Sequence, residues 1–218
     1  MLVSQLINTS FPALNITDKV MYALQLMDEY DVLHLPVISK DKYAGIVGKE
    51  ELLGEDENSV LSSIYTIEPL MVKNEEHVLT ALKTVAKHHL SLLPVVNEQA
   101  ELMGNLLTKD LLTALATFIG TEEKGGIIVL ETNKRNFSFG ELSRLVETND
   151  AFITQLNTYT ETTTGLLIVT IKINNMEVSD IIATLQRYEY AVRYYFGEEE
   201  YANELRENYD HLIAYLNM

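Results

Sequence analysis

The sequence contains no cysteine, which excludes disulfide bonds, zinc–thiolate sites and thiol nucleophiles. No apolar run approaches the roughly 18 residues that a membrane-spanning helix needs. The first residues show no basic stretch followed by a long apolar core, so no secretory signal is expected. The chain also lacks the GxSxG, P-loop and GxGxxG patterns of common catalytic and nucleotide-hydrolysing sites. Together these absences predict a soluble cytoplasmic protein that is not an enzyme.

Positive charge is scarce in this chain. Sixteen Lys and Arg residues stand against 32 Asp and Glu residues, which gives a net charge of −16. Arginine is absent from residues 1–134 and first occurs at Arg135. A surface this acidic repels phosphate backbones, so no nucleic-acid partner is expected. A phosphate bound in the first part of the chain would depend on lysines or helix N-termini.

The five histidines do not form a pattern typical of metal ligation, because no HxxxH or HExxH spacing occurs. His88 and His89 end a predicted helix, where a positive charge favours the helix dipole. His34 directly precedes the Leu-Pro-Val of a predicted strand and is expected to face a cleft. The sequence therefore predicts no metal site.

One segment of the chain occurs twice, at residues 20–53 and 78–112. At an offset of 58 residues, the Leu-Pro-Val of 35–37 falls on that of 93–95. After one inserted residue, Gly45 falls on Gly104, and an acid followed by Leu-Leu recurs six residues later. The same order in both copies indicates an internal repeat.

Each copy predicts one supersecondary unit. Apolar residues at helical spacing open it, two short buried strands separated by a polar turn follow, and a second helix closes it. Thr17 and Asn74 are expected to cap the opening helices. Because one unit cannot bury its apolar face alone, the two should pack together, with the ligand site in their shared cleft.

This pattern resembles the CBS domain, and its duplication resembles a CBS pair. The resemblance implies an α+β fold with two β-α-β-β-α repeats, about 1–58 and 59–120, followed by a linker at 121–126. CBS pairs commonly bind adenine nucleotides between the repeats and commonly dimerise. The resemblance therefore implies an adenosine-containing ligand such as AMP, ATP or S-adenosylmethionine, and a homodimer.

Residues 127–197 predict the order βαββαβ, which is the ferredoxin-like arrangement. Behind a CBS pair this domain resembles an ACT domain, and the whole layout is similar to acetoin-utilisation accessory proteins. ACT domains often shape an amino-acid site with Pro-Gly-x-Leu. Here Gly140 and Leu142 match that element, whereas Phe139 replaces the proline. Residues 198–218 are acidic and then amphipathic, and they predict a C-terminal helix.

The resemblance also implies ligand-binding residues in the CBS pair. The family places an acid six residues after the glycine, where it accepts hydrogen bonds from ribose hydroxyls; Glu51 and Asp110 stand there, and Asp110 is the better match. Without a ligand, both acids would simply favour the first turn of a helix. The family's hydroxyl position is filled by Gly48 and Leu107, and Thr108 comes one residue late. The strands expected to supply further contacts contain His34, Pro36, Leu92 and Pro94.

Three functions remain open on the sequence. The first is a non-catalytic sensor that binds an adenosine ligand and transmits its occupancy to a dimer interface or to the ACT-like domain. The second is an interaction module without a ligand that regulates a partner enzyme. The third is an amino-acid sensor that uses the ACT-like domain near Gly140.

Overall fold

The computed structural model describes residues 1–64 and 68–197, and the predicted helix at 198–218 lies outside the described residues. The chain divides into two compact units, Met1–Phe118 and Ile119–Met218, and each is described by itself. In the described ranges, every helix is too short or too polar to cross a membrane.

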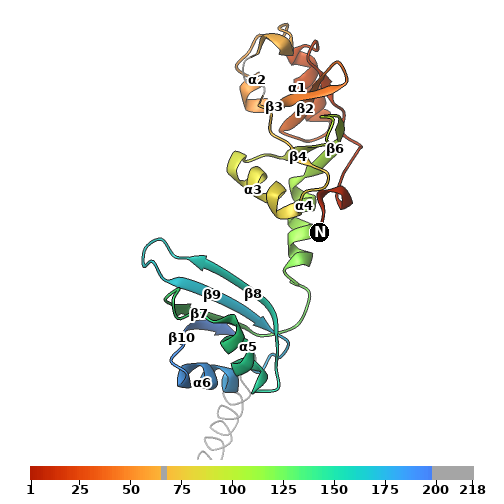
Figure 1. Ribbon diagram of the computed structural model, residues 1–218. Helices are drawn as coiled ribbons and strands as arrows, with labels where there is room; N and C mark the ends of the chain where they lie inside the picture. The colour runs from red at the N-terminus through yellow and green to blue at the C-terminus, as the bar shows by residue number, and fades with distance from the viewer. Residues whose placement is uncertain (65–67, 198–218) are drawn as a thin grey trace, which may run out of the picture. The chain divides into compact units, whose positions relative to one another are not determined.

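The first unit contains the two predicted repeats, each with the order β-α-β-β-α (Figure 1). The first repeat comprises β1 (Leu14–Asn15), α1 (Val20–Glu29), β2 (His34–Ser39), β3 (Lys42–Gly48) and α2 (Lys49–Leu52). The second comprises β4 (Val72–Lys73), α3 (Val78–His88), β5 (Leu92–Val96), β6 (Leu102–Leu107) and α4 (Thr108–Phe118). Short 3-10 turns, η1 (Val3–Gln5) and η2 (Leu61–Ser63), lie in the segments that lead into each repeat.

The repeat extends to the hydrogen-bond register of the two sheets. In each, the first strand pairs in parallel with the second, and the second pairs antiparallel with the third. The register shifts directly after Val37 in one sheet and after Val95 in the other. At these points Val37 lies opposite Gly45, and Val95 lies opposite Gly104. The duplicated sequence therefore produces the same irregularity in both copies.

The predicted helix caps are wrong by two or three residues. Helix α1 follows Lys19 rather than Thr17, because the Thr17 hydroxyl donates to Oδ1 of Asn15 (2.8 Å) within the preceding turn. Helix α3 follows His77 rather than Asn74. Nδ1 of His77 accepts a hydrogen bond from the backbone N–H of Leu79 (3.3 Å). This ring nitrogen therefore caps the helix in place of the expected side-chain amide of Asn74.

Both repeats share one apolar core, whose fully buried residues include Leu35, Leu93 and Leu106. The acid-Leu-Leu sequence divides between this core and the surface. Its first leucine is buried in each copy, at Leu52 and Leu111, whereas the second, Leu53 or Leu112, is 66% exposed. Each copy therefore leaves one large apolar side chain at the same exposed place.

The second unit confirms the predicted ferredoxin-like order βαββαβ (Figure 1). Its sheet has the strand order β10-β7-β9-β8 and is antiparallel throughout. Both helices pack on one face over an apolar core that includes Ile128, Leu142, Ile171 and Leu185. The elements are β7 (Ile127–Thr132), α5 (Phe139–Glu147), β8 (Ile153–Thr160), β9 (Leu167–Ile173), α6 (Ser179–Arg187) and β10 (Ala191–Phe196).

Candidate ligand-binding site

The segments that lead into the repeats cross over. Asn8, ahead of the first repeat, pairs with Asn105 in β6 of the second through two backbone hydrogen bonds of 2.8 Å. Glu68, ahead of the second repeat, pairs likewise with Ile46 in β3 of the first (2.8 and 3.2 Å). Each lead-in thus extends the sheet of the opposite repeat, which brings residues far apart in the sequence to one site.

Gly104 permits this crossing. A Cβ atom at this position would lie 2.6 Å from Cγ2 of Ile7 and 2.8 Å from the carbonyl oxygen of Asn8. Its φ of +147° also lies in a region that side chains disfavour. The repeated glycine of the sequence therefore has a structural role: it lets the lead-in approach the strand.

A pocket of about 590 Å³ opens between the first lead-in and α4. We call it the Asp110 pocket. One wall is a single helix face, since the lining residues of α4 are spaced three, four and seven apart. That wall consists of Asp110, Thr113, Ala114 and Thr117, and the remaining lining comes from Met1 and residues 5–10. Of the ligand-binding residues predicted from the sequence, Asp110 is the one that lines this pocket.

The α4 wall presents hydrogen-bond acceptors. The Thr113 hydroxyl donates to the carbonyl of Lys109 (3.1 Å), and the Thr117 hydroxyl donates to that of Thr113 (3.2 Å). With their protons directed to the backbone, both oxygens keep lone pairs for other partners. The Asp110 carboxylate adds an acceptor at the start of the same face. A molecule rich in hydroxyl or amino donors would be complementary to this wall.

The other residues predicted in this repeat lie away from the pocket wall. The Thr108 hydroxyl donates to the carbonyl of Leu90 (2.5 Å) and thereby closes the turn before α4. Leu92 and Pro94 are buried in β5, and Leu107, at the family's hydroxyl position, is buried as well. Their side chains hold the repeat together rather than facing an open space.

The acid of the first repeat has a different environment. A Cβ atom at Gly48 would lie 2.1 Å from Oε2 of Glu51, so the Glu51 side chain folds back over the start of α2. The equivalent helix α4 has eleven residues, whereas α2 has four. Pro36, also predicted as a ligand contact, is buried in β2. The two predicted half-sites therefore differ, and Asp110 is the acid that lines the 590 Å³ pocket.

His34 joins the two repeats. Its Nδ1 accepts the backbone N–H of Ser91 (3.1 Å), while Oγ of Ser91 accepts the backbone N–H of Leu33 (3.1 Å). Because Nδ1 is an acceptor here, the neutral ring carries its proton on Nε2. Burial lowers the pKa of His34, and Glu51 and Glu50 partly oppose this effect by attracting the protonated form. The sequence placed His34 near the cleft but gave no sign of Ser91, which aligns with Leu33.

Asn105 is fully buried, and neither Oδ1 nor Nδ2 has a hydrogen-bond partner among the described residues. It is opposite Pro94 in the β5–β6 pair, where the first repeat has Ile46 opposite Pro36. An unpaired buried amide is unfavourable by about 1–3 kcal/mol. Asn105 lies beside the lead-in that lines the Asp110 pocket. No hydrogen bond among the described residues accounts for its buried amide.

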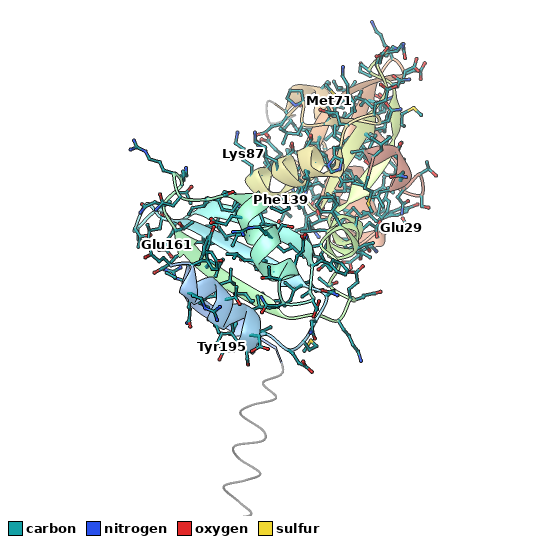
Figure 2. The ribbon with its side chains drawn as sticks, turned by 60° about the horizontal axis from the view of Figure 1, so that its bottom comes forward. Glu29, Met71, Lys87, Phe139, Glu161 and Tyr195 are labelled. Carbon is teal, nitrogen blue, oxygen red and sulfur yellow. The ribbon has the colours of Figure 1, made fainter. Side chains whose placement is uncertain are left out.

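Gly140 and Leu142, predicted as an amino-acid site in the second unit, are not among the residues that line its described openings. Gly140 is in the first turn of α5, and a Cβ there would meet no atom within 4 Å. Leu142 is fully buried in the core. Phe139, labelled in Figure 2, is 54% exposed at the start of the helix. A 450 Å³ opening lies beside the β7–α5 loop instead, lined by Asn133, Lys134, Arg135, Asn136 and Gly165.

A smaller opening of about 200 Å³ is lined in part by Tyr190 and by Glu141, the residue between Gly140 and Leu142. The Tyr190 hydroxyl donates to Oε2 of Glu141 (2.6 Å). Burial and this carboxylate both raise the pKa of Tyr190, so the phenol stays protonated at neutral pH. Within residues 1–64 and 68–197, no group of three potential metal ligands comes together.

Comparisons with known proteins agree with this architecture. A protein-family model described as the CBS domain matches residues 3–58 and 61–117. The chain is 29% identical over 140 residues to an inosine-5'-monophosphate dehydrogenase of Korarchaeum cryptofilum; the match covers 64% of this chain and 29% of that protein. A homoserine O-acetyltransferase of Methanosarcina acetivorans is 30% identical over 117 residues, which cover 52% of this chain and 22% of the relative. The chain thus spans less than a third of these curated relatives.

Solved structures match as well. A CBS domain pair/ACT domain protein from Thermotoga maritima has 28% identity and a TM-score of 0.51, and the match covers 55% of this chain and 99% of that one. The CBS pair domain of a putative Mg²⁺ transporter from Shewanella oneidensis has 16% identity and a TM-score of 0.50, covering 54% and 71%. The second likeness concerns the fold alone.

Proposed function

Since the chain belongs to the CBS-domain family, we propose that it is a non-catalytic regulatory protein that binds a small adenosine-containing ligand in the Asp110 pocket. Occupancy of the pocket is then transmitted to a homodimer interface or to the ACT-like unit. The predicted similarity to acetoin-utilisation accessory proteins, and with it any partner enzyme, remains a prediction.

This proposal rests on the position of Asp110 in the wall of an open pocket. The pocket lies between the segment that leads into the first repeat and α4 of the second repeat. A volume of about 590 Å³ is in the range of small-molecule sites. An ionised carboxylate offers acceptors alone, which suits two neighbouring ribose hydroxyls. The glycine-dependent crossing of the lead-in supplies the opposite wall.

The same geometry offers a route for transmission. A ligand in the pocket would contact the lead-in and α4 at once and would hold them together. Helix α4 ends at Phe118, directly before the second unit in the chain. The Phe118 ring also contacts the ring of His77 (5.9 Å between centroids), just ahead of α3. Ligand binding would therefore favour one position of α4, the helix that precedes the ACT-like unit.

A homodimer is proposed through α1 and α3, as the family resemblance implies. Both helices expose large apolar side chains in the described chain: Met21 and Tyr22 are about half exposed on α1, as is Leu79 on α3. Sedimentation at several concentrations tests this point. A protein that stays monomeric throughout would contradict it.

The ligand is tested by a thermal-shift panel on the full-length protein with AMP, ADP, ATP, NAD, S-adenosylmethionine and the common amino acids. At a hundred times its dissociation constant a ligand stabilises by about 2.7 kcal/mol, which raises the melting temperature by a few degrees. An adenosine ligand should produce this shift, and the Asp110→Ala variant should lose it.

A second candidate function is an interaction module without a ligand. Two observations favour it: Leu107 is buried at the family's hydroxyl position, and the hydroxyl of Thr108 is engaged by Leu90. If this function is correct, no compound should change the melting temperature of the wild-type protein. The Asp110→Ala variant should then give the same results as the wild type across the panel. A partner enzyme recovered by the wild-type protein would then support it.

A third candidate is an amino-acid sensor in the second unit. The 450 Å³ opening beside the β7–α5 loop carries Lys134 and Arg135, which suit a carboxylate. A thermal shift with an amino acid alone, lost in Arg135→Gln, would favour this function over the adenosine sensor.

A further inference from the structure

The Asp110 pocket has few charged groups, and its ionised side chain is an acid. Among the described residues that line it, none is Lys, Arg or His, and Asp110 carries the one ionised side chain. The other lining side chains are hydroxyls, amides or apolar groups. The α-ammonium group of Met1, which also lines the pocket, is engaged by Nε2 of His77 (3.1 Å). Apart from this group, a bound anion would meet the Asp110 carboxylate without a cationic side chain to balance it.

The surroundings of the pocket add to this effect. Residues 1–118 contain eight lysines, no arginine and sixteen acids. Lys109 precedes Asp110 but is exposed and does not line the pocket. Asp110 also occupies the first turn of α4, where its own charge offsets the partial positive charge of the helix N-terminus. The described walls therefore lack the lysine and arginine side chains that commonly hold a phosphate, and the N-terminus of α4 already faces a carboxylate.

The acceptor character of the α4 wall points the same way. The hydroxyl protons of Thr113 and Thr117 are directed to backbone carbonyls, so these side chains present oxygen lone pairs beside the Asp110 carboxylate. Phosphate oxygens are acceptors and would face other acceptors there. Hydroxyl, ammonium or sulfonium-bearing groups would instead be attracted.

We propose that the Asp110 pocket takes a phosphate-free nucleoside, neutral or positively charged, and discriminates against nucleotides that carry phosphate. This inference rests on the proposed function and names the class of ligand within it. The ribose hydroxyls donate to Asp110, and the remainder of the ligand lies along the threonines of α4.

The test is isothermal titration of the full-length protein with adenosine, S-adenosylmethionine, AMP and ATP at one ionic strength. Adenosine or S-adenosylmethionine should bind at least about tenfold more tightly than AMP, and ATP should be weaker still. Raising the salt concentration should reduce the difference in affinity between the phosphate-free ligands and the nucleotides, because screening weakens the repulsion between the phosphate and the acidic pocket.

Two variants make the charge of the pocket less negative and are expected to fold. Asp110→Asn keeps the size of the side chain, and it should weaken the binding of adenosine and strengthen the binding of AMP. Thr113→Lys adds a cation on the exposed pocket wall and should strengthen AMP and ATP by about tenfold or more. Thr113→Gln, of similar reach but uncharged, is the matched control for the added length, and it should lack the tenfold gain in affinity for AMP and ATP.

Tighter binding of AMP or ATP than of adenosine by the wild-type protein would overturn this inference and leave the proposed adenosine-ligand function standing. An unchanged preference in Thr113→Lys, with binding intact, would overturn it as well. Failure of all four compounds to bind would overturn the proposed function and the inference together.

Discussion

The backbone N–H of Ser91 donates to Nδ1 of His34 across the two repeats, at 3.1 Å. The contact requires a neutral or at least Nδ1-deprotonated imidazole, because a protonated ring has no acceptor. It therefore couples the pairing of the repeats to pH.

The stability of the CBS pair should fall as His34 becomes protonated. Burial lowers the pKa of His34 below its ordinary 6.5, so the folded state binds fewer protons than the unfolded state. The stabilisation is present above pH 6.5 and is lost as pH falls through the folded pKa. Between pH 7.5 and 5.5 in urea titrations, the wild type should lose more stability than His34→Asn, whose amide oxygen can replace Nδ1. Equal losses in both proteins would contradict the role of His34.

Gly104→Ala should destabilise the first unit by roughly 2–4 kcal/mol, because the added methyl group meets Ile7 and the carbonyl of Asn8 at a disfavoured φ. It should also weaken the ligand, since the lead-in forms a pocket wall. Gly54→Ala is the matched control in the same unit: its Cβ would meet one atom, at 3.5 Å, and its effect should stay within about 1 kcal/mol. Hydrogen exchange in residues 1–118 measures both, and equal effects would refute this role of Gly104.

Replacing the unpaired amide of Asn105 should stabilise the protein. Asn105→Ile introduces the residue that stands at the equivalent position of the first repeat, Ile46, and removes two buried polar atoms without partners. The gain should be about 1 kcal/mol, seen as a higher unfolding midpoint. A loss of similar size would show that the amide has a partner in solution, such as a water molecule.

Arg193 ties the strand ends of the second unit together. Its guanidinium donates to both carboxylate oxygens of Glu161 (2.8 and 3.0 Å) and to Glu131 (3.1 Å). The hydrogen bonds from Arg193, and a further one from the Thr164 hydroxyl, lower the pKa of Glu161, which is labelled in Figure 2. Carbon-13 NMR titration should find Glu161 below the ordinary glutamate range and back within it in Arg193→Gln. An unshifted pKa in the wild type would show that the pair does not persist in solution.

The repeat made much of the fold predictable. Two copies of one pattern identify the same helix, strands and glycine twice, and the structure confirms the β-α-β-β-α order in each. The alternating apolar runs of residues 127–197 likewise predict the ferredoxin-like order. Helix starts were less predictable, because the Thr17 hydroxyl pairs within its turn and His77 caps α3 in place of Asn74.

The site was only partly predictable, since its walls come from segments that cross between repeats. Asp110 follows from the spacing after Gly104, but no local pattern announces that residues 5–10 lie opposite it. The contact of Ser91 with His34 is equally hidden, because the aligned residue Leu33 contributes only its backbone. Such contacts depend on tertiary pairing, which the periodicity of a single sequence does not encode.

In the proposed function, one half of the CBS pair binds the ligand through Asp110. The most direct measurement compares adenosine-ligand affinity in the wild type, Asp110→Ala and Glu51→Ala by titration calorimetry of folded, full-length protein. Asp110→Ala should weaken ligand binding by about tenfold or more, whereas Glu51→Ala should retain it. Equal affinity in the wild type and Asp110→Ala would show that Asp110 does not bind the ligand.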